Sequence, residues 1–448
     1  MRSVHFIGIG GIGMSALARL YRARGVRVSG SDRERSELTD ALRREGMRVI
    51  IGPHRAANVP ARASEAIRTS AVRDDNPEVR AARRRKIPVQ YYAEALGDIT
   101  REYHSIAVAG AHGKSTTTAL TALVLIRGKR DPTVIVGTKL REFRDTNFRR
   151  GRSPYFVFEA DEYRDAFLNS SPAVAVITNI DREHLDFHPT LRGNEAAFLK
   201  FLKRLPRGGV AILNRDNVSV RRVGARLHRA RPDIRITWYS LRDPVATRLR
   251  PLLNIPGDHN LANALAAHTV GTTLHIPRST IFSAIAAYRG SWRRFDERGK
   301  LWGADVIADY AHHPTELRAT LKGARERFPK RRIVAVFQPH HYERLKHLFR
   351  EFAGAFRDAD LALFIDVYEV AGREEKRTSP NISSAALARA VAKQGTKAHY
   401  LGRAVTRASI KPFLRSGDVL LLMGAGTIWN MTLRLLRGEN PRRKKHSL

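Results

Sequence analysis

The segment Val108–Thr118 (VAGAHGKSTTT) carries the residues best suited to phosphate chemistry. An apolar run precedes it and an apolar-periodic run follows, which predicts a strand, a glycine turn and a helix. Such a turn cradles nucleotide phosphates because the N–H groups at the helix N-terminus point at the anion. Lys114 would reach the β- and γ-phosphates, and the Ser115 hydroxyl would ligate Mg²⁺. The turn from Gly110 to Ser115 is shorter than the GxxxxGK[ST] pattern, and this indicates an ATP-dependent amide ligase rather than an ordinary P-loop NTPase.

Carboxylates follow the next two predicted strands of this region. Glu159-Ala-Asp-Glu162 ends the run Tyr155–Glu159, and Asn179–Asp186, which includes His184, ends the run Ala173–Ile180. We expect both groups at the sheet edge that holds Lys114, since the carboxyl ends of parallel strands share an edge. Oxygen ligands suit Mg²⁺, whereas a histidine ligand is less usual for it. The alternative is a surface acidic cluster that balances nearby arginines.

The N-terminal run contains a second glycine loop. Gly8, Gly10 and Gly13 satisfy G-x-G-x-x-G between a predicted strand and a predicted helix, and Asp32 ends the following strand. This fingerprint suits NAD, FAD or any other ligand with a diphosphate. The glycines could also serve only the packing of the helix against the strand.

Two further polar groups have less decided roles. Asn260 and Asn263 begin an alanine-rich helix, where Asn263 could read an adenine edge or serve as an N-cap. His312 and His313 would project from a loop that follows a strand, and a third zinc ligand at typical spacing is missing. The residues themselves therefore favour two loop histidines, one of which caps the next helix.

Composition limits the function further. Lys and Arg total 80 against 43 Asp and Glu, a net charge of +37, which raises nucleic-acid binding as an alternative. The basic residues are scattered and are not interleaved with aromatic side chains, so we expect no nucleic-acid partner. Zero cysteines exclude thiol chemistry. The absence of any run of about 18 apolar residues and of a signal-peptide pattern predicts a cytoplasmic protein without a membrane span.

The chain of 448 residues is too long for one core. Apolar runs alternate with helical periodicity, which predicts α/β domains built on mostly parallel sheets. We place a Rossmann-like domain at 1–104, a central P-loop ATPase-like domain at 105–293, and a Rossmann-like C-terminal domain with a basic tail at 294–448. In the last domain, four apolar runs each end in polar or glycine residues, where open α/β sheets bind ligands.

The chain resembles a Mur ligase along nearly its whole length. The resemblance rests on collinear motifs, which are His5–Ser15, Ser29–Asp32, Thr69–Val72 with Asn76-Pro77, Gly110–Thr118, Glu159–Glu162, His184–Asp186, Gly257–Ala267, Arg293–Phe295, Asp309–Glu316 and Phe337–His340. It implies a first domain that holds UDP, a central domain that holds ATP, and a third domain that holds the incoming amino acid. The first glycine loop would then bind the UDP diphosphate rather than a nicotinamide cofactor.

The reaction that the resemblance implies is ATP- and Mg²⁺-dependent joining of L-alanine to UDP-N-acetylmuramate in peptidoglycan precursor synthesis. The sugar's carboxylate would attack the γ-phosphate to give an acyl phosphate, which the amino group of L-alanine would then attack. A related ligase that adds another amino acid or a peptide is the alternative. A monomer or a dimer is expected.

The resemblance also implies roles for single residues. Catalysis would rest on Lys114, Glu159, His184 and Arg294. The Mg²⁺ ligands would be Ser115, Glu159 and His184. ATP would be bound by Gly110, His112, Gly113, Lys114, Ser115, Thr116, Asn263, Arg294 and Asp309. UDP-N-acetylmuramate would be bound by Gly10, Gly11, Gly13, Met14, Ser15, Asp32 and Ser70. The amino acid would be bound by Tyr310, His312, His341 and Arg344.

Two positions depart from the family pattern. His341 stands where the family usually has an arginine that could grip the amino acid's carboxylate, and Arg344 and Tyr310 remain. Loss of a bidentate partner could alter the choice of amino acid. Thr427 stands where the family has an aspartate, and the sequence offers no physical account of that change.

Overall fold

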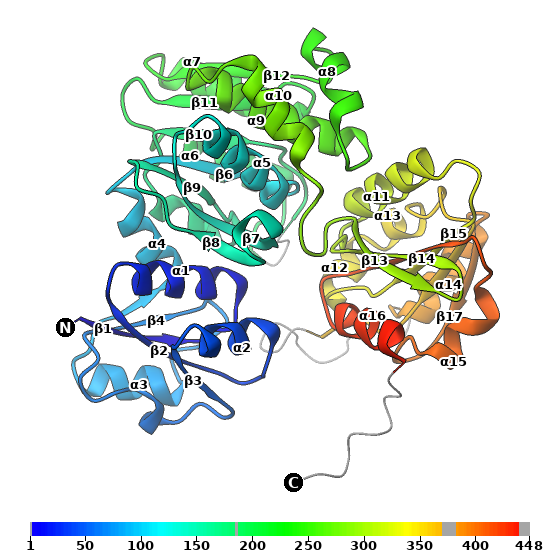
Figure 1. Ribbon diagram of the computed structural model, residues 1–448, viewed down its shortest axis with the longest axis horizontal. Helices are drawn as coiled ribbons and strands as arrows, with labels where there is room; N and C mark the ends of the chain where they lie inside the picture. The colour runs from blue at the N-terminus through cyan, green and yellow to red at the C-terminus, as the bar shows by residue number, and fades with distance from the viewer. Residues whose placement is uncertain (1, 184–186, 370–381, 439–448) are drawn as a thin grey trace. The chain divides into compact units, whose positions relative to one another are not determined.

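The computed structural model describes residues 2–183, 187–369 and 382–438 and contains three β-sheets (Figure 1). These residues form two compact units. The first unit comprises 1–252 and 262–288 and holds two of the sheets, and the second comprises 253–261 and 289–448 and holds the third. His184 and the basic tail from 439 onward lie outside the described residues.

The first sheet has five parallel strands in the order β3-β2-β1-β4-β5. The strands are β1 (Ser3–Ile7), β2 (Arg27–Asp32), β3 (Arg48–Ile51), β4 (Glu65–Arg68) and β5 (Val89–Tyr91). The helices that accompany them are α1 (Ile12–Ala23), α2 (Glu37–Arg44), α3 (Pro77–Arg84) and α4 (Tyr92–Thr100), with a 3₁₀ turn at Ala56–Asn58. Local chemistry fixes their starts, as at α3, where Asn76 Oδ1 accepts the Glu78 N–H and Pro77 occupies the first turn.

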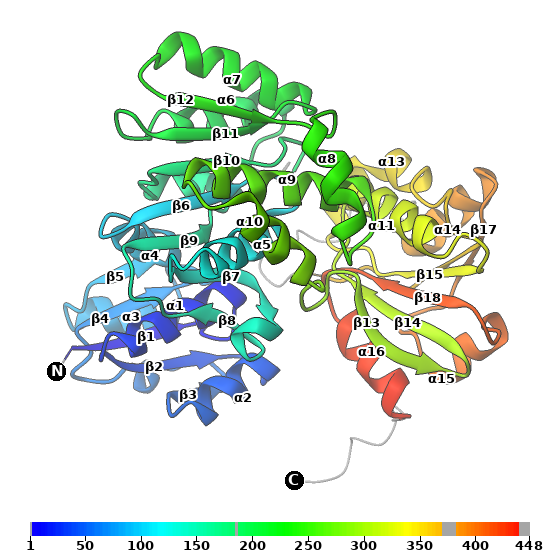
Figure 2. The same ribbon diagram turned by 45° about the horizontal axis from the view of Figure 1, so that its top comes forward.

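The second sheet has seven strands in the order β12-β11-β10-β6-β9-β7-β8 (Figure 2). They are β6 (His104–Ala109), β7 (Thr133–Leu140), β8 (Thr146–Arg149), β9 (Tyr155–Glu159), β10 (Val174–Ile177), β11 (Val210–Asn214) and β12 (Arg235–Tyr239). Only the β7–β8 pair is antiparallel. The helices are α5 (Lys114–Arg127), α6 (Leu191–Leu202), α7 (Val218–Ala230), α8 (Pro244–Leu249), α9 (Asp258–Thr273) and α10 (Arg278–Ala287), with 3₁₀ turns at Arg141–Phe143, Tyr163–Asn169 and Arg250–Leu252.

The third sheet has six strands in the order β13-β14-β18-β15-β16-β17. They are β13 (Asp296–Leu301), β14 (Ala304–Asp309), β15 (Ile333–Phe337), β16 (Leu361–Phe364), β17 (Lys397–Tyr400) and β18 (Val419–Met423), and only β13 runs antiparallel to its neighbour. The helices are α11 (Pro314–Arg327), α12 (Tyr342–His347), α13 (Phe349–Ala353), α14 (Ser384–Lys393), α15 (Arg407–Ile410) and α16 (Ile428–Arg437), with a 3₁₀ turn at Lys411–Phe413.

The central strands of the sheets are buried on both faces. Ile106, Ala107, Val108 and Ala109 of β6 are all fully buried, as the continuous apolar run predicts for a parallel strand covered by helices. The predicted α/β class with parallel-sheet domains is confirmed. Among the helices of the described residues, none is long and apolar enough to cross a membrane.

One predicted strand boundary was wrong. The predicted strand Ala173–Ile180 ends at Ile177, because the polar residues after it turn toward the phosphate loop. The helix predicted after the glycine turn begins at Lys114, directly after Gly113.

Candidate functional site

The phosphate loop joins β6 to α5 through two glycines in conformations that favour glycine. Gly110 has φ +140° and Gly113 has φ +83°, and Gly113 is the N-cap of α5. A Cβ at Gly110 would collide with the Thr178 hydroxyl. The sequence therefore folds here into a turn whose backbone approaches its neighbours closely and whose helix begins at Lys114.

Residues that follow β10 hold this loop in place. The Asn179 side chain accepts the His112 N–H at 2.9 Å and donates to the His112 carbonyl at 2.9 Å. The Thr178 hydroxyl donates to the same carbonyl at 2.6 Å, and the Asn179 carbonyl accepts the Ala111 N–H. Because β10 lies beside β6, the loop is fixed by its neighbouring strand as well as by its own helix.

Lys114 lies inside the loop with its ammonium already bonded. Its Nζ donates to Glu162 Oε2 at 2.8 Å and to the Gly110 carbonyl at 2.6 Å. Burial alone would lower the pKa of Lys114, but the charges of Glu162 and Asp161 outweigh it and raise that pKa above its usual range. Lys114 is therefore a fixed positive charge at the place where phosphate would lie.

Ser115 and Glu159 meet beside this lysine. The Ser115 hydroxyl donates to Glu159 Oε2 at 3.1 Å, and the Gly137 N–H of β7 donates to Glu159 Oε1. A hydroxyl and a carboxylate at this separation are the oxygen donors that Mg²⁺ takes, so the residues present fit that ion. The predicted pairing of Ser115 with Glu159 is thus found, whereas the third predicted ligand, His184, lies outside the described residues.

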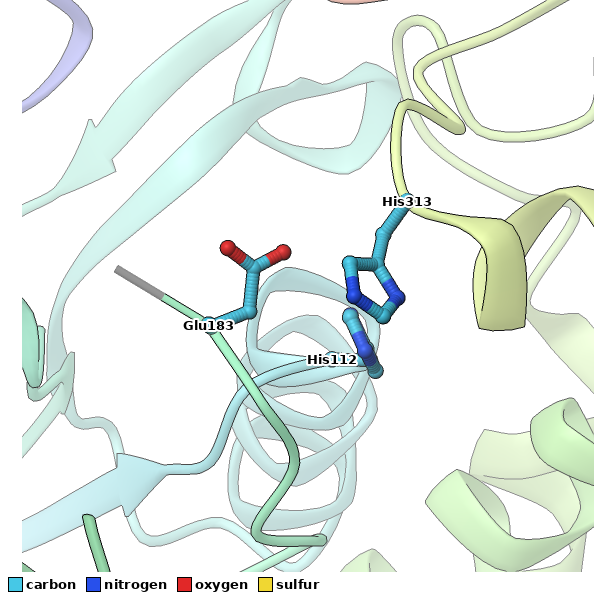
Figure 3. A group of neighbouring side chains, drawn as sticks. All are labelled: His112, Glu183 and His313. Atoms are coloured by element: carbon cyan, nitrogen blue, oxygen red, sulfur yellow. The ribbon is translucent and has the colours of Figure 1, made fainter. Parts of the chain in front are cut away.

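His112 and Glu183 extend this edge of the second sheet (Figure 3). The closest ligand atoms of these two side chains lie within 4.8 Å of one another, and His112 Nε2 lies 3.2 Å from Asp181 Oδ2. Figure 3 also labels His313, which belongs to the second unit and is described there. His112, predicted to bind ATP, therefore lies among carboxylates that follow β10.

Asn263 packs against the phosphate loop. Its Oδ1 accepts the Thr117 hydroxyl at 3.1 Å, and a Cβ at Gly113 would collide with that same oxygen. The N-cap alternative was wrong, because α9 begins at Asp258 and Asn263 lies in its second turn. Asn260 likewise is inside α9, where its amide donates to the Pro256 carbonyl at 2.7 Å.

The first glycine loop lies between β1 and α1, and Asp32 is part of its frame. The Gly10 N–H donates to Asp32 Oδ2 at 2.8 Å, and the N–H groups of Gly8 and Ile9 donate to the Ser31 carbonyl. Gly11 is the N-cap of α1, without a side-chain cap. Asp32 was expected beside a ribose hydroxyl, and in the structure its carboxylate accepts a hydrogen bond from the loop backbone.

The other residues expected at UDP differ in exposure. Met14 and Ser15 are buried in α1, and Gly13 faces the Tyr92 ring so closely that a Cβ would lie 2.8 Å from it. Ser70 is exposed, just beyond the end of β4 beside β1. The exposed loop residues thus lie at the carboxyl edge of the sheet, with Met14 and Ser15 behind them in the packing.

In the second unit, Asp309 is the last residue of β14 and Tyr310 follows it. Asp309 accepts the N–H groups of Phe295 at 2.7 Å and Ala311 at 2.8 Å. Burial raises the pKa of Asp309 above its usual range, and the charge of Arg294 partly offsets that rise. The Arg294 guanidinium lies 4.9 Å from the Tyr310 ring centroid. Asp309 therefore organises the loop that carries Tyr310.

Three of the residues expected at the amino acid gather around His340. Its ring lies 5.8 Å from that of His312, whose other neighbour is Tyr310 at 5.3 Å, and Arg344 Nη1 lies 3.3 Å from His340 Nδ1. The neighbouring His313 caps α11, since its ring accepts the Thr315 N–H at 3.3 Å, so the predicted capping histidine is confirmed.

The chain matches Mur ligase family domains along most of its length. Residues 3–104 match the catalytic domain of the Mur ligase family, 108–251 match the Mur ligase middle domain, and 293–426 match the Mur ligase glutamate ligase domain. A UDP-N-acetylmuramate–L-alanine ligase from Desulfosudis oleivorans is 40% identical over 97% of this chain and 98% of its own length. The chain belongs to the Mur ligase family.

Other relatives and solved structures are also similar to this chain along nearly its whole length. A UDP-N-acetylmuramate–L-alanine ligase from Anaeromyxobacter sp. (strain Fw109-5) is 41% identical, with 95% of each chain covered. The crystal structure of the UDP-N-acetylmuramate-alanine ligase from Thermotoga maritima matches with a TM-score of 0.80 and 27% identity over 98% of this chain and 99% of that chain. A murein peptide ligase from Psychrobacter arcticus shares the fold, with a TM-score of 0.70, 21% identity and 98% of each chain covered.

The structure explains one of the two departures from the Mur ligase pattern. The Gln338 amide donates to Thr427 Oγ1 at 3.0 Å, while its Oε1 accepts the Ile428 N–H at the start of α16. Residue 427 therefore needs a hydrogen-bond acceptor, which threonine supplies as an aspartate would. His341 is buried with φ +81°, and its N–H donates to the Tyr368 carbonyl.

Several residues of the site had no assigned role in the sequence-based prediction. They are Glu162 on Lys114, Thr178 and Asn179 on the phosphate loop, Gly137 on Glu159, and His340 with Tyr368 near the predicted amino-acid residues. Position was the local signal: Glu162 belongs to the carboxylate group expected at the sheet edge that holds Lys114, and Thr178 and Asn179 follow a buried strand. Gly137 and Tyr368 carry no such signal.

Proposed function

We propose that this Mur ligase joins L-alanine to UDP-N-acetylmuramate with ATP and Mg²⁺, forming ADP and phosphate, as a step of peptidoglycan precursor synthesis. The proposal is carried by the Lys114, Ser115 and Glu159 constellation at the carboxyl edge of the second sheet. Full-length similarity to ligases that bear this name supports the choice of substrates.

The reaction has two steps. The lactyl carboxylate of the sugar attacks the γ-phosphorus, the bond to ADP breaks, and an acyl phosphate forms. The amino group of L-alanine then attacks the acyl carbon, and inorganic phosphate leaves while the amine loses its proton. Lys114 stabilises the charge that grows on the phosphoryl oxygens. Bound Mg²⁺, held by Ser115 and Glu159, with His184 as the third proposed ligand, would neutralise phosphate charge.

The remaining assignments belong to the same proposal. Arg294, Asp309 and Asn263, with the phosphate loop, serve ATP, and the first glycine loop with Asp32 and Ser70 serves the UDP-sugar. Tyr310, His312, His341 and Arg344 serve L-alanine. We propose domain boundaries at 1–104, 105–293 and 294–448, a cytoplasmic location, a monomer or dimer, and no nucleic-acid partner.

Phosphate release tests the function directly. Purified protein is incubated with ATP, Mg²⁺ and UDP-N-acetylmuramate and with L-alanine, L-serine, glycine or no amino acid. We expect release that requires both the sugar nucleotide and L-alanine, and loss of that release in Lys114→Ala. Release that equals the sugar-free control would contradict the ligase assignment. Preference for glycine or L-serine would instead correct the amino acid and point to His341.

A further inference from the structure

Asn147 is a buried polar side chain that reaches from the second sheet to α1, the helix that follows the first glycine loop. It lies on β8, the edge strand that pairs with β7, and its side chain is fully buried. Helix α1 follows directly on the first glycine loop, and it packs against both β7 and β8 (Figures 1 and 2). All of these elements belong to the first unit.

The Asn147 amide uses both of its ends on α1. Its Nδ2 donates to the Ile12 carbonyl at 2.5 Å and to the Ser15 hydroxyl at 3.0 Å. Its Oδ1 accepts from Arg19 Nη1 at 2.5 Å. Arg19 is itself held by Glu45, whose carboxylate oxygens lie 2.7 and 2.9 Å from its guanidinium nitrogens. A buried amide satisfied in this way loses its partners if α1 shifts along β8, and that shift is costly.

The two elements that Asn147 joins, α1 and β8, each connect to one of the proposed substrate sites. Ile12 is the first residue of α1 and follows directly on the loop Gly8–Gly11. On the other side, β8 pairs with β7, whose Gly137 N–H binds the Glu159 carboxylate that accepts from Ser115. Asn147 therefore ties the proposed UDP loop to the strand pair that also fixes the proposed Mg²⁺ carboxylate.

We propose that Asn147 is a positioning residue that sets the UDP-sugar loop relative to the ATP site. This inference rests on the proposed function, since it takes the glycine loop as the UDP site. The sugar's carboxylate must meet the γ-phosphate at bonding distance, and a small misplacement of one substrate relative to the other costs much rate. An amide suits the position because it presents donors to α1 and an acceptor to Arg19 at once.

Asn147→Asp tests the inference with little change in shape. The aspartate keeps an acceptor for Arg19 but sets an oxygen against the Ile12 carbonyl, where the amide donates. We expect the KM for UDP-N-acetylmuramate to rise about 10-fold or more and kcat to fall, because both loop and sugar are displaced. The Kd for ATP·Mg²⁺, measured by calorimetry without the sugar, should stay within about 2-fold of the wild-type value, because the phosphate loop has its own supports.

Thr146→Val is the matched control on the same strand. The Thr146 hydroxyl bonds only the carbonyls of Phe143 and Phe148 among the hydrogen bonds of the described residues, so this variant disturbs the hairpin but not α1. Arg19→Lys is a second, milder variant, since a lysine cannot bond Glu45 and Asn147 with the fixed fork of arginine. We expect it to raise the same KM in the same direction, and the control to leave it unchanged.

The outcomes separate the two proposals. An unchanged KM for the sugar nucleotide in both Asn147→Asp and Arg19→Lys overturns the positioning role. An equal loss of sugar and ATP affinity also overturns it, because that pattern reports general destabilisation. If the wild-type protein binds UDP-N-acetylmuramate but releases no phosphate with any amino acid, the ligase function fails, and the positioning role is judged on sugar affinity alone.

Discussion

The Lys114 ammonium of the phosphate loop forms an ion pair of 2.8 Å with the carboxylate of Glu162, which lies just beyond β9. The two side chains are 18% and 7% exposed, so the pair is shielded from solvent. Lys114 also donates to the carbonyls of Gly110 and Ala111. The ammonium is thus oriented by two carbonyls of its own loop and by the Glu162 carboxylate. The phosphate oxygens of bound ATP would share the ammonium with Glu162.

Glu162→Gln should make the protein less stable and more responsive to nucleotide. Removal of one partner leaves the Lys114 charge partly buried, which costs about 2 kcal/mol of the free energy of unfolding. Phosphates of bound ATP would restore a negative partner without competition from Glu162. We therefore expect a lower melting temperature than wild type, and a larger rise of that temperature on addition of ATP and Mg²⁺.

The control for this experiment is Glu102→Gln. Glu102 pairs with Arg24 at 2.9 Å, but its side chain is 55% exposed, and exposed pairs contribute little to stability. Its melting temperature should follow the wild type with and without nucleotide. If Glu162→Gln and wild type are stabilised equally by ATP, Glu162 does not compete for the lysine.

Gly137→Ala should weaken the response to Mg²⁺ in particular. A Cβ at this position would lie 2.7 Å from Glu159 Oε2, the oxygen that accepts from Ser115. The carboxylate must move, and we expect the Mg²⁺ concentration for half-maximal phosphate release to rise about 10-fold. Gly354→Ala is the matched control, since the nearest atom to a Cβ there is 3.9 Å away. Equal Mg²⁺ dependence in the two variants would show that Glu159 does not serve the ion.

Much of the fold follows from local sequence. The apolar runs at β6, β10 and β18 are buried on both faces, and such runs predict parallel strands without knowledge of their partners. The order of the strands could not be predicted in this way, because it is set by the packing of helices between distant segments. The position of β9 between β6 and β7 is one such result.

Local sequence likewise predicts some residues of the site and not others. Lys114, Ser115 and Glu159 could be predicted together, because each occupies the end of a strand or the start of the helix that follows. Gly137 and Asn147 could not, because they act through β7 and β8, where the strand order alone brings them near their partners. Asp32 was expected near a ribose hydroxyl, which stays a prediction, and its bond to the Gly10 N–H was not foreseen, although its place at the end of β2 makes that contact available.

Glu78 is a buried carboxylate in the first turn of α3, and it bonds to side chains of β1 and β2 in the first sheet. Its oxygens lie 3.0 Å from His5 Nε2 and 2.9 Å from His54 Nδ1, and they accept from Ser31 at 2.7 Å and Asn58 at 2.8 Å. Burial alone would raise the pKa of Glu78, but these hydrogen bonds outweigh it and lower that pKa well below its usual value of 4.5. The folded state therefore binds the proton of Glu78 more weakly than the unfolded chain does.

A lowered pKa in the folded state fixes the sign of the pH dependence. The stability that Glu78 contributes is fully present above its ordinary pKa of 4.5 and is lost as the pH falls below it. We expect Glu78→Gln to lower the melting temperature at about pH 7, by the equivalent of about 2 kcal/mol, and the gap to wild type to shrink toward about pH 3.5. Glu37→Gln, at a carboxylate 49% exposed, should show no such convergence. A gap that stays constant with pH would mean that the variant acts through packing alone.

Two adjacent threonines of α5 allow a test of Asn263 that leaves the asparagine in place. Thr117 and Thr118 are both fully buried, but Thr117 donates to Asn263 Oδ1, while no described residue bonds the Thr118 hydroxyl. Valine has nearly the shape of threonine, so Thr117→Val removes one hydrogen bond beside Gly113 and little else. We expect the KM for ATP to rise about 5-fold, which corresponds to about 1 kcal/mol, with the KM for UDP-N-acetylmuramate unchanged.

Thr118→Val is the control. It should leave both KM values unchanged and the melting temperature at or above that of the wild type, because a buried hydroxyl without a partner contributes nothing through its polarity. Equal KM values for ATP in the two variants would show that the Thr117 hydrogen bond does not orient the Asn263 side chain for ATP binding.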